Sequence, residues 1–332
     1  MKNLRFAPLA LALTLTLLAG CSLLPTPGAG PTPAPTTTTP LSTTSTSSTT
    51  TTSTPSTTTT STTLTSSTTA PAPSMSPPST STLGLLAFGD AGSGDATQMQ
   101  VATQMENWAA THRVDALLEA GDVVYPDGAP SRFAATIDAP YARLRASRPL
   151  WAALGNHDVM WNNGNDLMAY LSMPSRSYEK ILTNNDVTMQ ILVLDSNSVS
   201  VAQTEWLDSK LSSGPYRWRI VMFHHPVWSC SKHGNTQSVI SSWLPVLTSR
   251  NVDLVVTGHD HNYQRFQNAN TTFVVTGGGG MPTYAITSCS GTPPLQASAQ
   301  RHHFLGIEAT STALSVTAVA RTGETLDQVS IN

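Results

Sequence analysis

Residues 83–332 predict an α/β fold, either an α/β/α sandwich or a two-sheet β-sandwich flanked by helices. Two observations support this fold. Short runs of apolar residues recur along the segment, and continuous apolar character is typical of strands that are buried on both faces. Stretches with apolar residues at helical spacing lie between several of these runs, so strands and helices alternate along the chain.

The predicted strands are marked by the apolar runs themselves. In chain order they are Leu83–Phe88, Ala116–Ala120, Pro149–Leu154, Ile191–Leu194, Trp218–Phe223, Val252–Thr257, Phe273–Thr276 and Leu314–Val319. The last run lies in a helix-free stretch that begins near Phe304, so this stretch is expected to complete a second sheet.

The predicted helices cover residues 95–109, Gln203–Leu211 and Thr236–Arg250, with Arg132–Ala146 as a further candidate. The first begins with Asp95-Ala96-Thr97-Gln98, which resembles a capping box. Proline removes a backbone donor and clashes with the preceding turn, so Pro245 must kink or interrupt the third helix and Pro140 must break the candidate.

The chain before residue 83 differs from the rest. Residues 1–21 begin with Lys2 and Arg5, continue with an apolar run that is short for a membrane span, and end in Leu-Ala-Gly-Cys, which is the layout of a secretory signal. The ending also resembles a bacterial lipobox. We therefore expect a lipid on Cys21 that anchors the protein outside the cytoplasm of a bacterium, on a membrane or the cell surface. The alternative is an ordinary cleaved signal with an incidental cysteine.

Residues 22–82 consist almost entirely of Thr, Ser and Pro and carry no charged residue. Such a segment buries too little apolar surface to offset its chain entropy, so we expect a disordered stalk, extended or O-glycosylated, that tethers the domain. All 20 acidic residues but only 15 of the 17 basic ones lie in residues 83–332, which gives this domain a net charge of −5. This charge argues against a nucleic-acid-binding surface.

Polar residues that can bind metals follow five of the apolar runs. They are Gly89-Asp90-Ala91-Gly92, Gly121-Asp122-Val123-Val124-Tyr125, Gly155-Asn156-His157-Asp158, His224-His225-Pro226 and Gly258-His259-Asp260-His261. Ligands bind outside the carboxyl ends of strands in open α/β sheets, so these side chains are expected to meet at one edge. Carboxylate, imidazole, amide and phenolate groups without thiolates suit hard to intermediate metals. Their number fits two ions, which together can clamp the attacking and leaving oxygens in phosphoester hydrolysis.

These five motifs, in this order, resemble those of the calcineurin-like metallophosphoesterases over nearly all of residues 83–280. The resemblance implies a metallophosphoesterase-like α/β/β/α fold, with the metal site at the carboxyl ends of the strands. The stretch from His224-His225-Pro226-Val227-Trp228-Ser229 through His233-Gly234 resembles the small, tartrate-resistant kind of purple acid phosphatase. Two further details resemble the purple acid phosphatases in general. The first motif has no histidine after Asp90, and the second contains Tyr125. The implied activity is that of an acid phosphatase acting on small phosphomonoesters.

The resemblance also implies a role for each motif residue. A ferric ion would be held by Asp90, Tyr125 and His261, and a divalent ion (Fe, Zn or Mn) by Asn156, His224 and His259, with Asp122 bridging the two. A hydroxide on the metal pair would attack phosphorus, and His157 would protonate the leaving alkoxide as general acid. His233 stands where the small family members place a substrate-side histidine; a loop histidine without a catalytic role is the alternative.

Several neighbouring residues have a plainer interpretation. Asp158 is expected to orient His157 or to cap a turn, and His225 to point away from His224 if the strand continues. Residues 277–280, four consecutive glycines, are expected to form a tight turn near the site.

Two cysteines remain after Cys21. Cys230 and Cys289 are expected to form a disulfide, because the chain is expected to be exported. Zinc ligation is the alternative, but no Cys-x-x-Cys spacing supports it.

Two other functions compete with the phosphomonoesterase. One is a manganese- or zinc-type phosphodiesterase or nucleotidase, against which Tyr125 and the missing histidine argue. The other is a catalytically inactive, surface-displayed binding module, which should have lost a ligand, whereas all seven are present. The sequence contains no signal for an oligomer.

Overall fold

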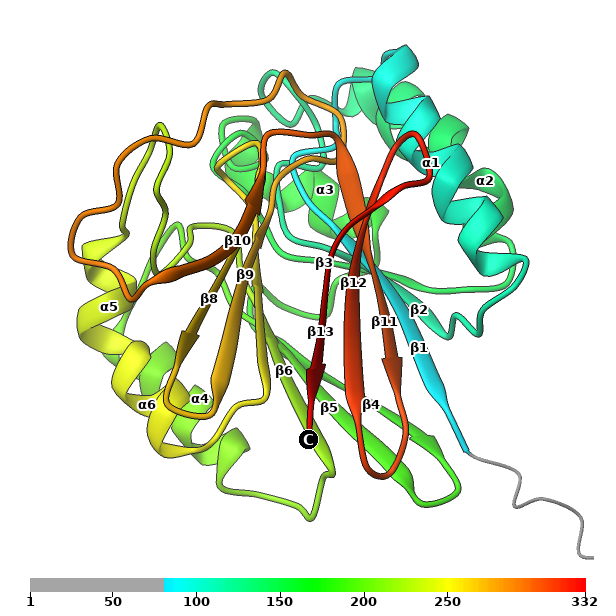
Figure 1. Ribbon diagram of the computed structural model, residues 1–332. Helices are drawn as coiled ribbons and strands as arrows, with labels where there is room; N and C mark the ends of the chain where they lie inside the picture. Colours follow the sequence, from blue (N-terminus) through cyan, green and yellow to red (C-terminus); the bar gives the residue numbers. More distant parts are fainter. Residues whose placement is uncertain (1–80) are drawn as a thin grey trace, which may run out of the picture. The chain divides into compact units, whose positions relative to one another are not determined.

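In the computed structural model, which describes residues 81–332, two mixed β-sheets pack face to face and carry helices on their outer faces (Figure 1). The first sheet has the strand order β13 (Thr325–Ile331), β12 (Leu314–Ala320), β11 (His303–Ala309), β1 (Leu83–Phe88), β2 (Ala116–Glu119), β3 (Leu150–Ala152). The second has the order β10 (Leu295–Ala299), β8 (Tyr263–Asn268), β9 (Thr271–Thr276), β7 (Leu254–Thr257), β6 (Trp218–Met222), β5 (Val187–Val193), β4 (Tyr178–Asn184).

The helices are short and cover the two outer faces. They are α1 (Ala96–Ala109), α2 (Ala139–Arg145), α3 (Asn165–Tyr170), α4 (Val201–Leu211), α5 (Gln237–Ser242) and α6 (Leu244–Ser249). Single turns of 3₁₀-helix at Pro130–Arg132 and Asn162–Gly164 and a π-helical turn at Ala134–Asp138 complete the helical structure of the described residues. Helices α1 and α2 lie over the first sheet and α4, α5 and α6 over the second (Figure 1). The predicted helix-flanked two-sheet sandwich is therefore confirmed.

Three hydrophobic clusters hold these layers together. The central cluster lies between the sheets and contains fully buried side chains from both, such as Leu118 and Trp218. The second joins α1, α2 and α3 to the first sheet through residues such as Met105, and the third joins α4, α5 and α6 to the second sheet through residues such as Trp243. Strands β1, β2, β5, β6 and β7 are thus covered on both faces, which explains their continuous apolar sequences.

The capping residue and the prolines that mark the predicted helices lie at or near helix starts. The Asp95 carboxylate accepts hydrogen bonds from the backbone N–H groups of Thr97 and Gln98 and so caps α1. The segment 236–250 is interrupted, since α5 ends at Ser242 and α6 begins at Leu244 with Pro245 in its first turn. The expected break at Pro140 is not found: the π-helical turn Ala134–Asp138 runs directly into α2, and Pro140 lies in the first turn of α2.

Several strands were not predicted, and most of them lie at the sheet edges. Strands β4, β10 and β13 are edge strands made mostly of half-buried and exposed positions, and none contains a continuous apolar run. The expected signal peptide, Cys21 and the stalk up to residue 80 lie outside the described residues. Within residues 81–332, no helix is both long enough and apolar enough to cross a membrane.

Candidate metal centre

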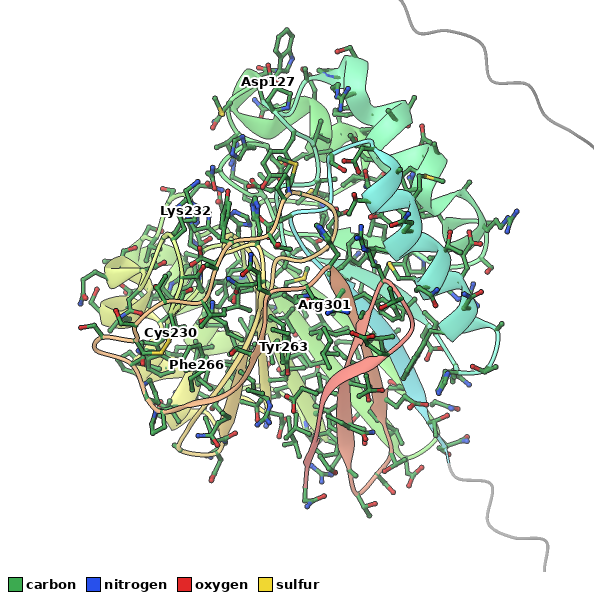
Figure 2. The ribbon with its side chains drawn as sticks, turned by 45° about the horizontal axis from the view of Figure 1, so that its top comes forward. Asp127, Cys230, Lys232, Tyr263, Phe266 and Arg301 are labelled. Atoms are coloured by element: carbon green, nitrogen blue, oxygen red, sulfur yellow. A yellow bond between two sulfur atoms is a disulfide. The ribbon has the colours of Figure 1, made fainter. Side chains whose placement is uncertain are left out.

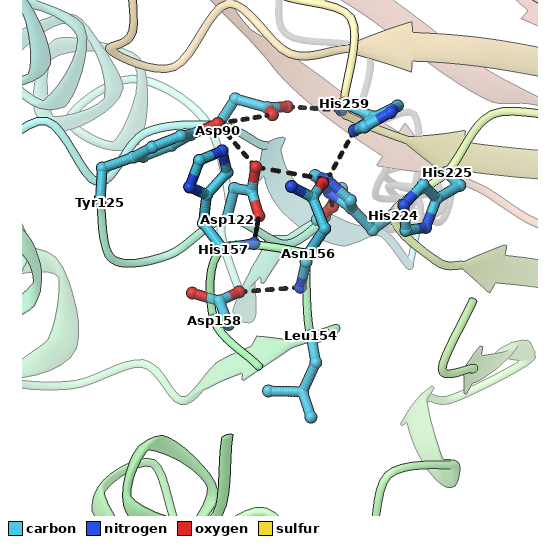
Figure 3. A network of polar contacts seen from close by, with 12 residues as sticks. Asp90, Asp122, Tyr125, Leu154, Asn156, His157, Asp158, His224, His225 and His259 are labelled. Atoms are coloured by element: carbon cyan, nitrogen blue, oxygen red, sulfur yellow. Dashed lines mark hydrogen bonds and ion pairs between the residues drawn. The ribbon is translucent and has the colours of Figure 1, made fainter. Parts of the chain in front are cut away.

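The loops that follow β1, β2, β3, β6 and β7 bring the predicted ligands together (Figure 3). Strands β1, β2 and β3 are parallel, as are β6 and β7, so within each sheet these loops leave from the same edge. The two edges meet at the site, where the backbone N–H of His259, after β7, donates to Asp90, after β1, over 2.8 Å. Asp90, Asp122 and His259 have left-handed backbone, with φ of 56°, 54° and 71°. Such strain in residues other than glycine is concentrated at functional sites.

Both aspartates are buried, and each has one oxygen fixed by the backbone and one directed at the other ligands. The Oδ1 of Asp122 accepts from the backbone N–H of His157 over 2.9 Å, and the Oδ2 of Asp90 accepts from that of His259. The remaining oxygens face Tyr125 and the histidines. This backbone support holds the two carboxylates in place before any metal binds.

The first group of ligands surrounds the Tyr125 hydroxyl. This oxygen lies 3.2 Å from Asp90 Oδ1, 2.7 Å from Asp122 Oδ2 and 3.1 Å from His261 Nε2. The His261 Nδ1 faces the Pro282 carbonyl at 2.9 Å and must carry a proton, so Nε2 is an acceptor in the neutral ring. One phenolic proton therefore faces three acceptors. A cation fits this arrangement, because metal ligands bind in their deprotonated forms.

The second group surrounds the buried His224 ring. Its Nδ1 faces the Ala120 carbonyl at 2.9 Å and is protonated, so Nε2 is the free coordinating nitrogen. Nε2 lies 3.1 Å from Asn156 Oδ1, 3.2 Å from His259 Nδ1 and 3.4 Å from Asp122 Oδ2. At most one proton on Nε2 is available to these partners, so a second cation fits here. The Asp122 Oδ2 belongs to both groups, as a bridging ligand requires.

The pKa shifts of the ligand side chains also fit two bound cations. Burial raises the pKa of Asp122, but His224, Tyr125 and His157 together outweigh burial and hold this pKa below its usual range. Burial lowers the pKa of His224, but Asp122, Asp90 and the Ala120 carbonyl together outweigh burial and raise this pKa to about 10. Burial and the charges of Asp90 and Asp122 raise the pKa of the Tyr125 phenol far above its usual value. The site thus retains protons at the two positions where cations fit.

Asp158 holds the turn that presents the bridging carboxylate. Its side chain accepts from the backbone N–H groups of Val123, Val124 and Gly155 at 2.8–3.2 Å. Burial and the charge of Asp122 raise its pKa to about 7. Of the two expected roles, the turn cap is the one that the structure contains; the His157 Nδ1 instead contacts the Pro126 carbonyl.

Gly155 shows how closely this turn approaches the bridging carboxylate. A Cβ atom at this position would lie 2.1 Å from Asp122 Oδ1 and 2.2 Å from the Asp122 nitrogen. We expect Gly155→Ala to displace Asp122 and to lower the bound metal per chain, while the circular dichroism of the fold is retained. Unchanged metal content measured by plasma emission would contradict this placement.

The predicted glycine turn also lies beside the site. The backbone N–H of Met281 donates to the Asp90 carbonyl, and a Cβ on Gly277 would approach Asp90 Oδ2 to 2.7 Å. The prediction for His225 was wrong. Strand β6 ends at Met222, so strand alternation does not apply, and the His225 ring lies 4.5 Å from the His259 ring (Figure 3). His224, His225 and His259 each have a potential metal-binding nitrogen, and these three nitrogens lie within 4.8 Å of one another.

A small cavity of about 90 Å³ opens over these groups. Its floor and walls include ligands from both groups, and its rim adds His157, Lys232, His233 and Tyr284. His157 and His233, both predicted as catalytic, therefore face the same cavity as the metal ligands. Lys232 and Tyr284 were not singled out in the sequence, because they lie on irregular loops rather than directly after a strand.

The disulfide Cys230–Cys289 joins the loop that carries Lys232 and His233 to the loop that carries Tyr284. The Thr287 N–H donates to the Cys230 carbonyl, and the Ser231 hydroxyl donates to the Ala285 carbonyl over 2.9 Å. Figure 2 labels Cys230 and Lys232 on the first of these loops. The cysteines are thus paired with each other and are not available to zinc.

Residues 85–263 match the profile of the calcineurin-like phosphoesterases, which covers more than half of the chain. The chain belongs to this family. The chain is also 28% identical over 239 residues to purple acid phosphatase 3 of Arabidopsis thaliana, a match that covers 60% of this chain and 63% of the plant protein. Human tartrate-resistant acid phosphatase type 5 is 28% identical over 242 residues, which cover 61% of this chain and 74% of the human protein. The resemblance to purple acid phosphatases is therefore confirmed.

Solved structures agree on the fold of the chain. The purple acid phosphatase PPD1 from yellow lupin superposes with a TM-score of 0.64 at 17% identity, covering 77% of this chain and 55% of the lupin chain. GAP50, described as the anchor in the inner membrane complex of Plasmodium, superposes with a TM-score of 0.67, also at 17% identity, covering 76% of this chain and 89% of its own. Family membership, the acid phosphatase relatives and the ligand cluster together support phosphoester hydrolysis at a metal site.

Proposed function

We propose that the protein is a phosphomonoesterase with a dinuclear centre of Fe(III) and a divalent iron, zinc or manganese ion. The observation that carries the proposal is the pair of acceptor groups that share Asp122 Oδ2. Asp90, Tyr125 and His261 would hold the ferric ion, because a phenolate and a carboxylate suit a small, highly charged cation. Asn156, His224 and His259 would hold the divalent ion.

The bound metals would supply Lewis acidity toward the phosphoryl group and a nucleophile from water near neutral pH. The protein's own residues perform the remaining tasks. The backbone N–H groups of His157 and His259 fix the carboxylates, and the Ala120 and Pro282 carbonyls fix the tautomers of His224 and His261. Such supporting contacts orient ligands and raise their basicity.

His157 is suited to protonate the leaving group. Its Nδ1 contacts the Pro126 carbonyl and therefore carries a proton, which leaves Nε2 as the nitrogen available to a substrate in the cavity. A protonated Nε2 would donate to the ester oxygen as the P–O bond breaks and so avoid release of an unprotonated alkoxide. The carbonyl contact keeps the ring in this orientation.

The cavity supports a monoester rather than a diester as substrate. A water molecule occupies about 30 Å³ in the liquid, so 90 Å³ holds about three waters, which is the scale of one phosphoryl group without its substituent. Three rim side chains can carry positive charge, namely His157, Lys232 and His233, and Asp122 is the one acidic residue among the described lining residues. This environment favours the dianion of a phosphomonoester over the single charge of a diester.

The alternatives are weakened by the ligands present. A manganese or zinc pair has no need of a phenolate ligand, whereas Tyr125 lies between two carboxylates at 2.7 and 3.2 Å. The fold also occurs in GAP50, which is described as an anchor, so the fold by itself does not identify an enzyme. What argues for an enzyme is that all seven predicted ligands converge here.

One experiment separates these functions. The purified full chain is analysed for iron, zinc and manganese and assayed on p-nitrophenyl phosphate and bis(p-nitrophenyl) phosphate. We expect two metals per chain, iron among them, and faster turnover of the monoester. Preference for the diester with manganese or zinc would identify the phosphodiesterase, and two bound metals without turnover of either ester would identify the binding module.

We further propose that Cys21 is lipidated and anchors the domain outside the cytoplasm of a bacterium, which the Leu-Ala-Gly-Cys sequence and the Thr/Ser/Pro-rich segment support. Cys21→Ser is expected to move the protein from the membrane fraction to the soluble extracytoplasmic fraction, because a lipid chain contributes about 0.8 kcal/mol per buried CH₂. The measurement is fractionation with mass spectrometry of the N-terminal peptide. An unmodified Cys21 in wild-type protein would support the ordinary cleaved signal.

A further inference from the structure

The Lys232 side chain lies on the rim of the cavity without an acidic partner among residues 81–332. It lines the cavity, is exposed, and takes part in none of the ion pairs of this segment. Its ammonium lies 4.3 Å from the centroid of the Tyr284 ring. The Tyr284 ring in turn stacks on the His261 ring, with centroids 4.0 Å apart and planes 15° apart. A cation–π contact of this kind holds the ammonium in place while leaving its hydrogen-bond donors free.

The backbone around this lysine is held on both sides. Cys230 is bonded to Cys289, and the neighbouring Ser231 hydroxyl donates to Ala285. The Asn262 side chain donates both to this hydroxyl and to the Tyr284 carbonyl, at 2.8 and 3.1 Å. The two loops therefore present the ammonium and its aromatic support as one unit. A pre-organised group loses less conformational entropy when it binds a ligand.

The size of the cavity determines which part of a substrate meets Lys232. The cavity of about 90 Å³ has room for about one phosphoryl group, so we expect the leaving group to extend over the rim. There the unpaired ammonium is a cation that complements a negative group on the leaving-group side. A neutral leaving group would form no ion pair with the ammonium, which would stay hydrogen-bonded to water.

We propose that Lys232 forms a subsite for a second anionic group of the substrate, a carboxylate or phosphate on the leaving-group side. This inference rests on the proposed phosphomonoesterase function and specifies its substrate class: phosphomonoesters and phosphoanhydrides whose leaving group is itself an anion. Lys232 is then a specificity-determining residue, and Tyr284 positions it.

The expected effect is moderate, because the ammonium is exposed. Exposed ion pairs contribute little, so the second anionic group should improve affinity about 3- to 5-fold at low salt. High salt should reduce this preference, since screening shortens the Debye length to about 3 Å at 1 M. Lys232→Met keeps the length of the side chain and should remove the preference, and Lys232→Glu should reverse it.

The test uses two phosphonates, which are not hydrolysed, so binding is read without turnover. Propylphosphonate and 3-phosphonopropionate differ only in a terminal methyl or carboxylate. Their dissociation constants are measured by calorimetry on the metal-loaded full chain for wild type, Lys232→Met and Lys232→Glu. Lys180→Met is the matched control, because Lys180 on β4 also lies over aromatic rings, Trp151 and Tyr178, but does not line the cavity.

We expect wild type and Lys180→Met to bind the carboxylated phosphonate about 3- to 5-fold more tightly, and Lys232→Met to bind both equally. Equal binding by wild type, or a preference that persists in Lys232→Met, would overturn the subsite while leaving the phosphatase intact. A wild type that binds neither phosphonate and hydrolyses no phosphomonoester would overturn the proposed function and the subsite with it.

Discussion

Asp122→Asn is expected to remove both metal ions and to lower kcat/KM on p-nitrophenyl phosphate by about 10³-fold or more. Asp122 Oδ2 lies in both acceptor groups, 2.7 Å from the Tyr125 hydroxyl and 3.4 Å from His224 Nε2. The amide keeps the volume but removes the charge that two cations would share. Metal ions contribute several kcal/mol to such reactions, and each factor of ten corresponds to about 1.4 kcal/mol.

The matched control is Asp127→Asn on the same loop. The Asp127 carboxylate accepts from the Ala129 N–H and does not line the cavity, and an asparagine oxygen can accept the same bond. This variant should keep its metals and activity within about twofold of wild type, as surface substitutions usually do. Two metals retained in Asp122→Asn, measured by plasma emission, would show that Asp122 does not bridge them.

His157→Ala is expected to slow the hydrolysis of alkyl phosphates by about 10²–10⁴-fold, the usual contribution of general acid catalysis. The loss on p-nitrophenyl phosphate should be clearly smaller, because nitrophenolate leaves readily without a proton. The support of Asp122 by residue 157 comes from the backbone N–H, which alanine retains. Metal content should therefore stay near that of wild type.

Steady-state kinetics on glycerol 3-phosphate and p-nitrophenyl phosphate measure this difference. His233→Ala is the comparison variant, since His233 lines the same cavity and its backbone N–H is held by Asp260. Equal losses on both substrates in His157→Ala would mean that His157 only positions the phosphate. A leaving-group dependence in His233→Ala instead would assign the proton transfer to His233.

Much of the site was predictable because its residues follow buried strands directly. Parallel strands place their carboxyl ends at one edge, so Asp90, Asp122 and Asn156 were expected to meet once their strands were recognised. The same reasoning failed for His225. It assumed that the strand alternation continues past Met222, whereas the chain leaves the sheet there and turns His225 toward His259.

Other features had no local signal. The position of Lys232 depends on Tyr284, which is 52 residues away in the sequence, and on contacts between two irregular loops. The edge strands β4, β10 and β13 consist mostly of half-buried and exposed positions, so they lack the continuous apolar run that marks a buried strand. The local sequence pattern identifies residues that directly follow a buried strand. Contacts between loops that are far apart in the sequence depend on the whole fold, so this pattern does not predict them.

The visible absorption spectrum of the active, metal-quantified protein tests the dinuclear iron assignment most directly. A phenolate bound to Fe(III) gives a charge-transfer band, so the purified wild type should be purple or pink. Tyr125→Phe should lose this band, because its ring remains but the oxygen between Asp90 and Asp122 is gone. A fully active wild type that is colourless and contains no iron would contradict the assignment and favour the manganese- or zinc-type enzyme.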